Sequence, residues 1–130
     1  MDCLEGWLMA LRSSRKLIVV EGKKDAAALA QFGIPAIPLN RRPLFSFAED
    51  IAARTKDCVI LTDLDTEGKR LYAMLKEHLT RNGVRIDTQF REWLFRETTL
   101  RQIEGLVSYA EKEEKKKEGK LTPRQSSDCR

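Results

Sequence analysis

The stretch VILTDLDTEGKRL, residues 59–71, sets an apolar run directly against three acidic side chains. The apolar run has the length of a buried strand, and the carboxylates of Asp63, Asp65 and Glu67 follow it closely. Two such charges about 4 Å apart repel by ~1 kcal/mol in water and by ~4 kcal/mol at the effective dielectric of a protein surface. A divalent cation would offset this repulsion, so the stretch predicts a strand that ends in a metal site.

The bulk composition is that of a soluble, globular chain with one domain. Its 130 residues are near the commonest domain size, and 42% of them are apolar against 34% charged. No window approaches the ~18 uncharged apolar residues of a membrane span, and the acids Asp2 and Glu5 argue against an export signal. Three widely spaced cysteines form no zinc pattern or disulfide framework, which favours a reducing cytoplasm. The net charge of +4 is compatible with a polyanionic partner but does not establish one.

Hydrophobic periodicity predicts strands that alternate with helices along most of the chain. Two capping boxes, Ser46 with Glu49 and Thr99 with Gln102, are expected to open the third and the last helix. Pro38 marks its strand as a sheet edge, because proline cannot donate to a ladder on both sides. The expected helices are residues 2–13, 23–32, 46–55, 67–82 and 99–109, and the expected strands are 16–20, 35–40, 58–62 and 84–90.

This alternation predicts an α/β fold, with a mainly parallel central sheet of about four strands and helices on both faces. We expect an N-terminal helix at residues 1–15 and the α/β domain at residues 16–110. Residues 111–130 are rich in both charges and contain Leu121 as their only large apolar residue. Such a composition predicts a solvated helix extension that runs into a disordered tail.

A second acid, Glu21, ends the first strong strand just as Asp63 and Asp65 end the third. The carboxyl ends of parallel strands share one edge of a sheet, where ligands of such folds bind. The glutamate and the aspartates are therefore expected to meet in space if their strands are neighbours. Mg²⁺ prefers one or two carboxylates together with water and substrate phosphates. The sequence thus predicts a Mg²⁺ site at this edge, with Mn²⁺ as the alternative ion.

Each acidic signal also has an ordinary structural explanation. A glutamate after a strand is most often a helix cap or a surface charge, and an Asp-x-Asp at a strand end is often simple loop chemistry. Asp65 and Glu67 would also favour the positive N-terminus of the following helix. Both signals fall at one predicted sheet edge, each beside a glycine, and this coincidence favours function. On spacing alone the structural and the functional interpretation are about evenly balanced.

Basic side chains near the same edge are candidate phosphate ligands. Lys23 and Lys24 begin the helix after the first strand, where a phosphate would also meet the helix N-terminus. Taken singly, each basic residue is more often a solvated surface charge. We favour the loop pair before Pro43 for contact with a phosphate backbone. The full set is Lys23, Lys24, Arg41, Arg42, Lys69 and Arg70. Trp7, Trp93 and Phe95 could stack on bases, but we expect them in the core.

Two stretches together resemble a known family. VVEGKKDAAAL at residues 19–29 and ILTDLDTEGKRL at residues 60–71 are similar to the Toprim domain. This domain is shared by type IA and type II topoisomerases, bacterial-type primases, OLD-type nucleases and the ribonuclease that matures 5S ribosomal RNA. The resemblance covers residues 16–95, and over its whole length the chain most resembles the small stand-alone Toprim proteins of archaea and some bacteria.

The family pattern is a glutamate after the first strand and an Asp-x-Asp after the third, and Glu21, Asp63 and Asp65 match it. The resemblance implies a Rossmann-like fold and gives Glu21 the role of general acid or base. It makes Asp63 and Asp65 catalytic metal ligands. Glu67 would be a third ligand, as in the type IA version, and Glu21 itself is also a candidate ligand. Small relatives usually carry Asn-Gly where this chain has Asn40-Arg41, so the loop backbone is expected to differ.

Topoisomerases need a separate tyrosine domain, and primases need zinc and helical domains, for which this chain has no room. The leading hypothesis is therefore a Mg²⁺-dependent nuclease, a hydrolase acting on RNA or DNA. The rival is a non-catalytic module that binds metal and nucleic acid, or a subunit of an RNA-processing or replication assembly. Transfer to a small nucleotide is a third alternative. We expect nucleic acid as the partner, no membrane, and further protein partners or self-association as open alternatives.

Overall fold

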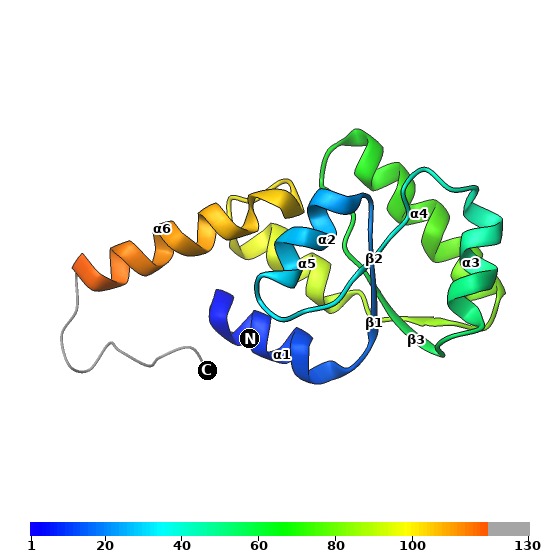
Figure 1. Cartoon of the computed structure of the whole chain (residues 1–130), viewed down its shortest axis with the longest axis horizontal. Coiled ribbons are helices and arrows are strands. Elements are labelled where there is room, and N and C mark those ends of the chain that lie inside the picture. Colours follow the sequence, from blue (N-terminus) through cyan, green and yellow to red (C-terminus); the bar gives the residue numbers. More distant parts are fainter. Residues whose placement is uncertain (120–130) are drawn as a thin grey trace.

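The computed structural model describes residues 1–119, in which a four-stranded sheet lies between two layers of helices (Figure 1). All strand pairs are parallel, which confirms the predicted α/β architecture. The strands β1 (Leu17–Val20), β2 (Ile37–Pro38), β3 (Asp57–Ile60) and β4 (Arg85–Ile86) lie in the order β2-β1-β3-β4. The helices are α1 (Leu4–Ser14), α2 (Lys23–Ala30), α3 (Leu44–Ala52), α4 (Thr66–Arg81), α5 (Gln89–Glu97), the 3-10 turn η1 (Ile103–Gly105) and α6 (Leu106–Gly119).

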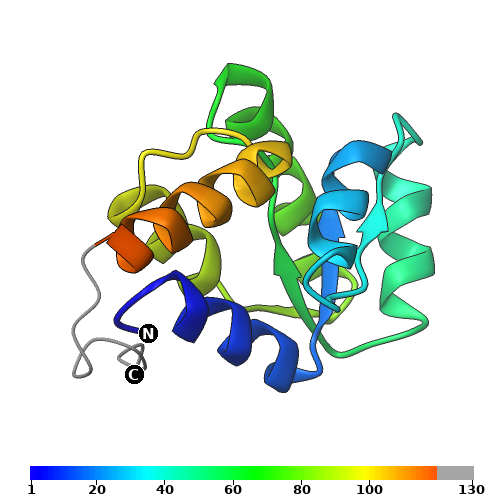
Figure 2. The same ribbon diagram turned by 60° about the vertical axis from the view of Figure 1, so that its left-hand side comes forward.

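The sheet separates two hydrophobic clusters because side chains alternate along its central strands. Along β1, Ile18 and Val20 enter one cluster and Val19 enters the other. The first cluster is covered by α1, α2, α5 and α6, and the second by α3 and α4. Figure 2 shows α1 and α6 together on the same side of the sheet. No helix within residues 1–119 is long and apolar enough to cross a membrane.

The strand expected at residues 84–90 is wrong beyond Ile86, because the chain turns into helix α5 at Gln89. Phe90 and Trp93 lie on one face of this helix and pack on Trp7 of α1, with ring centroids 6.2 and 6.5 Å away. The alternation at residues 84–90 resembles that of a strand, but the contacts of this segment with helix α1 decide its structure. Burial of the rings of Trp7, Phe90 and Trp93 outweighs the local preference for a strand. The expected core positions of both tryptophans and of Phe95 are confirmed.

Neither predicted capping box is formed. Helix α3 begins at Leu44, directly after Pro43, whose φ of −56° is already helical, and the Ser46 hydroxyl donates to the Pro43 carbonyl. After α5, the Thr98 hydroxyl accepts the amide of Leu100, and the last helix does not start until η1 and α6. Helix α6 runs on to residue 119, so the expected helix extension is confirmed, whereas residues 120–130 lie outside the described part of the chain.

Candidate metal and phosphate site

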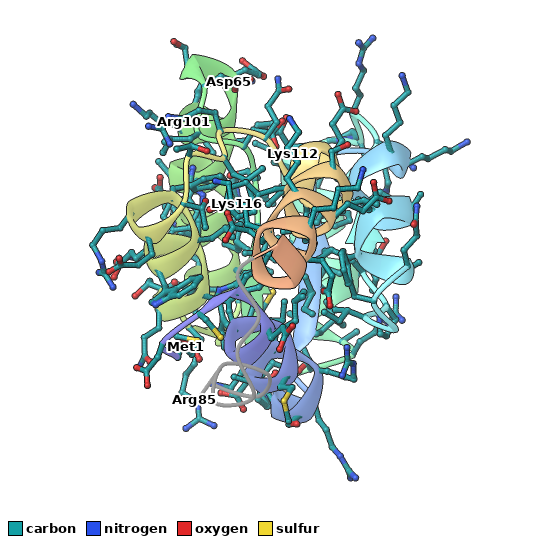
Figure 3. All side chains as sticks on the ribbon, turned by 90° about the vertical axis from the view of Figure 1, so that its left-hand side faces the viewer. Met1, Asp65, Arg85, Arg101, Lys112 and Lys116 are labelled. Carbon is teal, nitrogen blue, oxygen red and sulfur yellow. The ribbon has the colours of Figure 1, made fainter. Side chains whose placement is uncertain are left out.

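Strands β1 and β3 are direct neighbours, with Ile18 paired to Val59, so the residues that follow them emerge side by side. The amide of Asp63 donates a hydrogen bond of 2.8 Å to Oε1 of Glu21. The structure thus brings together the two acids that the sequence places 42 residues apart. Figure 3 shows Asp65 at one end of the molecule and Arg85, at the start of β4, at the opposite end.

The three acids at this edge each accept one backbone amide. Oδ1 of Asp63 accepts from Ile103 at 2.8 Å, and Oδ1 of Asp65 caps helix α4 by accepting from Gly68 at 2.8 Å. Within residues 1–119 the second carboxylate oxygen of Glu21, Asp63 and Asp65 accepts no hydrogen bond. These oxygens are free to bind a ligand, while the bonded ones fix the side-chain positions.

Burial makes this edge unfavourable for negative charge. The pKa of Asp63 is raised to about 6, mainly by desolvation and to a smaller extent by the carboxylates of Asp25, Glu21 and Asp65, against the lowering effect of the hydrogen bond from the amide of Ile103. Desolvation is also the main cause that raises the pKa of Glu21. Buried acids with neighbouring acids are typical of functional sites, since a folded core gains nothing from such repulsion.

A fourth acid, Asp25, belongs to the same group and was missed by the sequence analysis. Its side chain is 7% exposed, and its Oδ2 accepts the amide of Gly22 at 3.1 Å at the start of α2. Burial raises the pKa of Asp25, and it also forms a backbone hydrogen bond with Glu104. The position three residues after a helix cap was the available signal, but it indicated only capping.

Glu67 lies apart from the three acids in its contacts. Its exposed carboxylate pairs with Arg70, whose Nε donates to Oε2 at 3.0 Å, and this hydrogen bond lowers the pKa of Glu67. The residue lines the same cavity as Glu21 and Asp63 but is oriented by its own helix. The structure therefore places Glu67 near the site without joining it to the buried acids.

The loop between β3 and α4 is packed too tightly for any side chain at Gly68. A Cβ atom there would lie 2.0 Å from the carbonyl oxygen of Asp63 and 2.8 Å from Oε1 of Glu21. The Thr62 hydroxyl donates to the Gly68 carbonyl at 2.8 Å and closes the loop from the other side. Glycine at this position is what allows helix α4 to begin directly against the two acids.

Arg91 of α5 holds the same loop and was not found from the sequence. Its Nε donates to the carbonyl of Thr62 at 3.0 Å and its Nη2 to that of Asp63 at 2.8 Å. The guanidinium lies over the rings of Tyr72 and Phe95, with centroid distances of 4.3 and 5.3 Å. Desolvation lowers the pKa of Arg91. No sequence signal pointed to this residue, because it falls just after the strand predicted at residues 84–90, where no element was expected.

A cavity of about 1130 Å³ opens beside the acids, and basic side chains form part of its wall. Lys23, Lys24, Arg41 and Arg42 line it as predicted, whereas Lys69 is exposed on α4 and does not line it. Arg42 is engaged elsewhere, because it pairs with Asp50 and its guanidinium lies 5.3 Å from the centroid of the Phe47 ring. The less exposed acids Glu21, Asp25 and Asp63 form the floor of the cavity, and its exposed rim carries Lys23, Lys24 and Arg41 together with the acids Glu67 and Glu104. Carboxylates beside cations suit a metal-bound phosphate.

The loop after β2 forms one side of this cavity and has an unusual backbone. Asn40 and Arg41 have φ values of 51° and 62°, in the left-handed region that residues other than glycine seldom adopt. The amide of Asn40 donates to the carbonyl of Glu21 at 2.9 Å, and that of Arg42 to the carbonyl of Leu39 at 3.1 Å. The loop is thereby fixed to the backbone of the catalytic candidate Glu21.

A family model described as the Toprim domain matches residues 16–92, which is more than half of the chain. The chain belongs to the Toprim family. Membership indicates a function related to nucleic acid and dependent on a metal ion. The acids of β1 and β3 that the sequence singled out lie inside the matched residues, whereas α1, η1 and α6 lie outside them.

This Toprim protein is also similar to archaeal proteins that carry the description UPF0292. It is 30% identical over 109 residues to the protein of Methanocaldococcus jannaschii, which covers 80% of this chain and 85% of that one. It is 37% identical over 102 residues to the protein of Pyrococcus horikoshii, with 75% and 76% covered. Among solved structures, a putative protein from Aquifex aeolicus superposes with a TM-score of 0.73 at 30% identity, covering 80% of this chain and 98% of that one.

The Toprim fold implies a magnesium site, and the donor set of this chain fits one chemically. Glu21, Asp63 and Asp65 offer hard oxygen donors, each with one oxygen not used in a hydrogen bond. Their side chains are not gathered in advance, since no group of three or more His, Cys, Asp or Glu within residues 1–119 is arranged to hold a metal. Of the four acids predicted to form the site, Glu21 and Asp63 are joined by a hydrogen bond, and Asp65 and Glu67 lie nearby.

Proposed function

We propose that this Toprim protein is a Mg²⁺-dependent nuclease that hydrolyses phosphodiester bonds in RNA or DNA. The observation that carries the proposal is the junction of Glu21 with Asp63 at the floor of a cavity that Lys23, Lys24 and Arg41 also line. Two neighbouring acids, one partly and one largely buried, would weaken binding of a polyanion unless a cation stood between them. A reaction on phosphate accounts for both kinds of charged residue, because the acids would bind the metal ion and the basic residues would bind the phosphate.

The side chains divide the work by their positions. Asp63 and Asp65 would hold Mg²⁺ through their free oxygens, and the ion would supply neutralisation of the phosphate charge and a bound water of lowered pKa. Glu21 would move the proton, because its burial raises its pKa toward the range of an acid–base catalyst. Arg41 and the two lysines at the start of α2 would hold the phosphates that flank the cleaved bond.

A non-catalytic module that binds metal and nucleic acid is the second candidate. The observation in its favour is that the acids of residues 1–119 are not gathered into a group of three that could hold a metal. Such a module would bind nucleic acid at the same basic rim but leave it intact. The two candidates differ only in turnover, so an activity measurement separates them.

The test is cleavage of labelled single- and double-stranded RNA and DNA with Mg²⁺, with Mn²⁺ and with a chelator. Glu21→Gln keeps an oxygen to accept the amide of Asp63 but removes the base, so we expect a loss of about 10²–10⁴ in rate. It should leave the Mg²⁺-induced rise in melting temperature in place. Asp63→Asn should lose both cleavage and that rise.

Glu77→Gln, an exposed substitution on α4, is the matched control and should change neither property. If Glu21→Gln abolishes the Mg²⁺-induced stabilisation as completely as Asp63→Asn does, Glu21 is a metal ligand and the proposed division of roles is wrong. If the wild-type protein cleaves none of the substrates with either ion, the nuclease proposal fails and the binding module replaces it.

A further inference from the structure

Phe45 is an exposed aromatic residue at the start of α3. It lies in the first turn of α3, directly after Leu44, which lines the cavity wall, and 62% of its surface is exposed. Within residues 1–119 the other exposed large apolar side chains are Met1 and Met9, at the N-terminus and on α1, which belongs to the opposite helix layer. Phe45 is thus the only aromatic residue among the exposed large apolar side chains of residues 1–119, and it directly follows a residue of the cavity wall.

The loop that precedes this ring is held in a costly conformation. Asn40 and Arg41 are consecutive residues in the left-handed region, and neither is a glycine. Such strain persists where surrounding contacts impose it, and it is concentrated at ligand clamps. Here the imposing contact is the hydrogen bond from the amide of Asn40 to the carbonyl of Glu21. This loop thus connects the backbone of the proposed catalytic acid to the start of α3, where Phe45 lies.

Arg41, like Lys23 and Lys24, lines the cavity and belongs to no ion pair of the described residues, and it is the nearest of the three to Phe45 in sequence. Its neighbour Arg42, in contrast, is held by Asp50 and by the ring of Phe47. An uncommitted guanidinium and an exposed ring, separated by a few residues, are the two elements that bind a nucleotide chain: charge for the phosphate and an apolar face for the base.

We propose that Arg41 and Phe45 form a docking site for single-stranded nucleic acid, with a phosphate on Arg41 and an unpaired base stacked on Phe45. The inference rests on the proposed function and adds to it the class of substrate. In a duplex both faces of each base are covered by its neighbours, so an exposed ring can stack only on a strand whose bases are free. The cavity that joins this rim to Glu21 and Asp63 would then receive the strand beyond the stacked base.

The experiment measures affinity without divalent ions, so that no strand is cut. Fluorescence anisotropy with the full chain compares three RNA probes and their DNA counterparts: a single strand, its duplex, and an abasic strand with the same number of phosphates. We expect the wild type to bind the single strand more tightly than the duplex. Phe45→Ala should weaken binding of the single strand by about 5- to 150-fold, the range for loss of one stacked base. It should leave binding of the abasic strand unchanged.

A second variant gives a direct signal. In Phe45→Trp the indole should be quenched by a single strand with bases and not by the abasic strand, while Trp7 and Trp93 remain buried and constant. Met9→Ala removes a side chain that is 59% exposed on α1 and is the matched control, with no expected effect on any probe.

The proposal is overturned if Phe45→Ala binds the single strand as the wild type does, or weakens the abasic strand equally. It is also overturned if the variant changes only the sedimentation of the protein, since Phe45 would then join copies of the chain. Binding that depends on Phe45 without any cleavage in Mg²⁺ would support the docking site while the nuclease proposal fails. Cleavage in Mg²⁺ that Phe45→Ala leaves unchanged would support the nuclease proposal while the docking site fails. If the wild type binds none of the probes, both proposals are overturned.

Discussion

The carboxylate of Asp63 is 9% exposed, and its burial raises its pKa from 3.8 to about 6. Between about pH 4 and pH 6 the folded state holds a proton that the unfolded chain has released. The higher pKa in the folded state therefore stabilises the protein fully below about pH 4. This stabilisation is lost as the pH rises through about 6. Near neutral pH the ionised Asp63 destabilises the apo protein.

Asp63→Asn should raise the melting temperature at pH 8 in the absence of metal. The amide keeps an oxygen to accept the amide of Ile103 and removes the buried charge. The gain should be on the order of 2–3 kcal/mol at pH 8 and should vanish as the pH approaches about 4. Melting curves from pH 4 to pH 8 test this. Equal melting temperatures of variant and wild type at pH 8 would show that the acid is not strained by burial.

Gly68→Ala should damage the site and the fold together. The new Cβ would lie 2.0 Å from the Asp63 carbonyl oxygen, which belongs to the backbone and cannot rotate away. We expect a loss of about 1–3 kcal/mol, as for an overpacked core position, and a smaller Mg²⁺-induced rise in melting temperature. Gly83→Ala is the control, because its φ of +82° makes alanine strained although no atom lies within 4 Å. Urea unfolding of both variants gives the comparison. A Gly68 variant with the stability and Mg²⁺ response of the Gly83 variant would contradict the proposed close packing.

At the scale of the element, helix α5 acts as a brace for the end of β3. Arg91 reaches from this helix to the carbonyls of Thr62 and Asp63 and is held over two rings. Because a lysine cannot serve two carbonyls in the same fork, Arg91→Lys is not conservative here. The orientation of the loop between β3 and α4, which carries Asp63 and Asp65, thus depends on helix α5, although α5 contributes no acid to the site.

Arg91→Lys should lower both the apparent Mg²⁺ affinity and the stability of the apo protein. One hydrogen bond to a buried carbonyl is lost, which costs about 1–3 kcal/mol, and the loop that carries Asp63 becomes less ordered. A Mg²⁺ titration followed by melting temperature is the measurement. Arg96→Lys, on the same helix but exposed and paired with Glu97, should leave the titration unchanged. An unchanged midpoint in the Arg91 variant would show that the brace does not set the geometry of the acids.

The sequence predicted the elements whose signals are local. Strands β1 and β3 are short apolar runs, and helix α4 carries an apolar face between Asp65 and Gly83, so each could be found without knowing its neighbours. The start of α5 could not, because the positions 84–90 suit a strand until the rings pack on Trp7. Propensity gives way to burial there.

The same distinction separates the site residues. Glu21 and Asp63 were predicted to meet because parallel strands end at one edge, and that rule needs only the order of the strands. Asp25 and Arg91 were missed because their roles arise from contacts with η1 and with the loop after β3, which no spacing in the sequence reveals. The engagement of Arg42 by Asp50 likewise depends on a turn of α3 that begins two residues earlier than predicted.

At the scale of the whole molecule, the net charge of +4 is too small to direct binding, so the arrangement of the cations decides where a polyanion lies. Lys23, Lys24 and Arg41 line the cavity without an ion pair among the described residues, whereas Arg42, in the loop before α3, pairs with Asp50 of that helix. We therefore expect the loop pair to divide, with Arg41 contacting the ligand and Arg42 engaged in the fold.

Arg41→Ala should reduce the dependence of nucleic-acid affinity on salt. Each phosphate contact that is lost should lower the magnitude of the log–log slope by about 0.7–0.9. Arg42→Ala should change the slope less, since that guanidinium already pairs with Asp50. Affinities measured over a series of salt concentrations give both slopes. If Arg42→Ala reduces the slope as much as Arg41→Ala does, the pair with Asp50 opens on binding and both arginines contact phosphate.

The strand order β2-β1-β3-β4 also has a consequence for how the chain acquires its structure during synthesis. Val19 pairs with Ile37 on one side and with Ile60 on the other, so β1 keeps an open edge until β3 has been made. Pairing at such sequence separation closes long loops and slows folding relative to a helical protein of equal size. The apolar strand LIVV therefore exposes an unpaired edge on the nascent chain, and an unpaired edge can associate wrongly until β3 has been synthesised and the sheet closes.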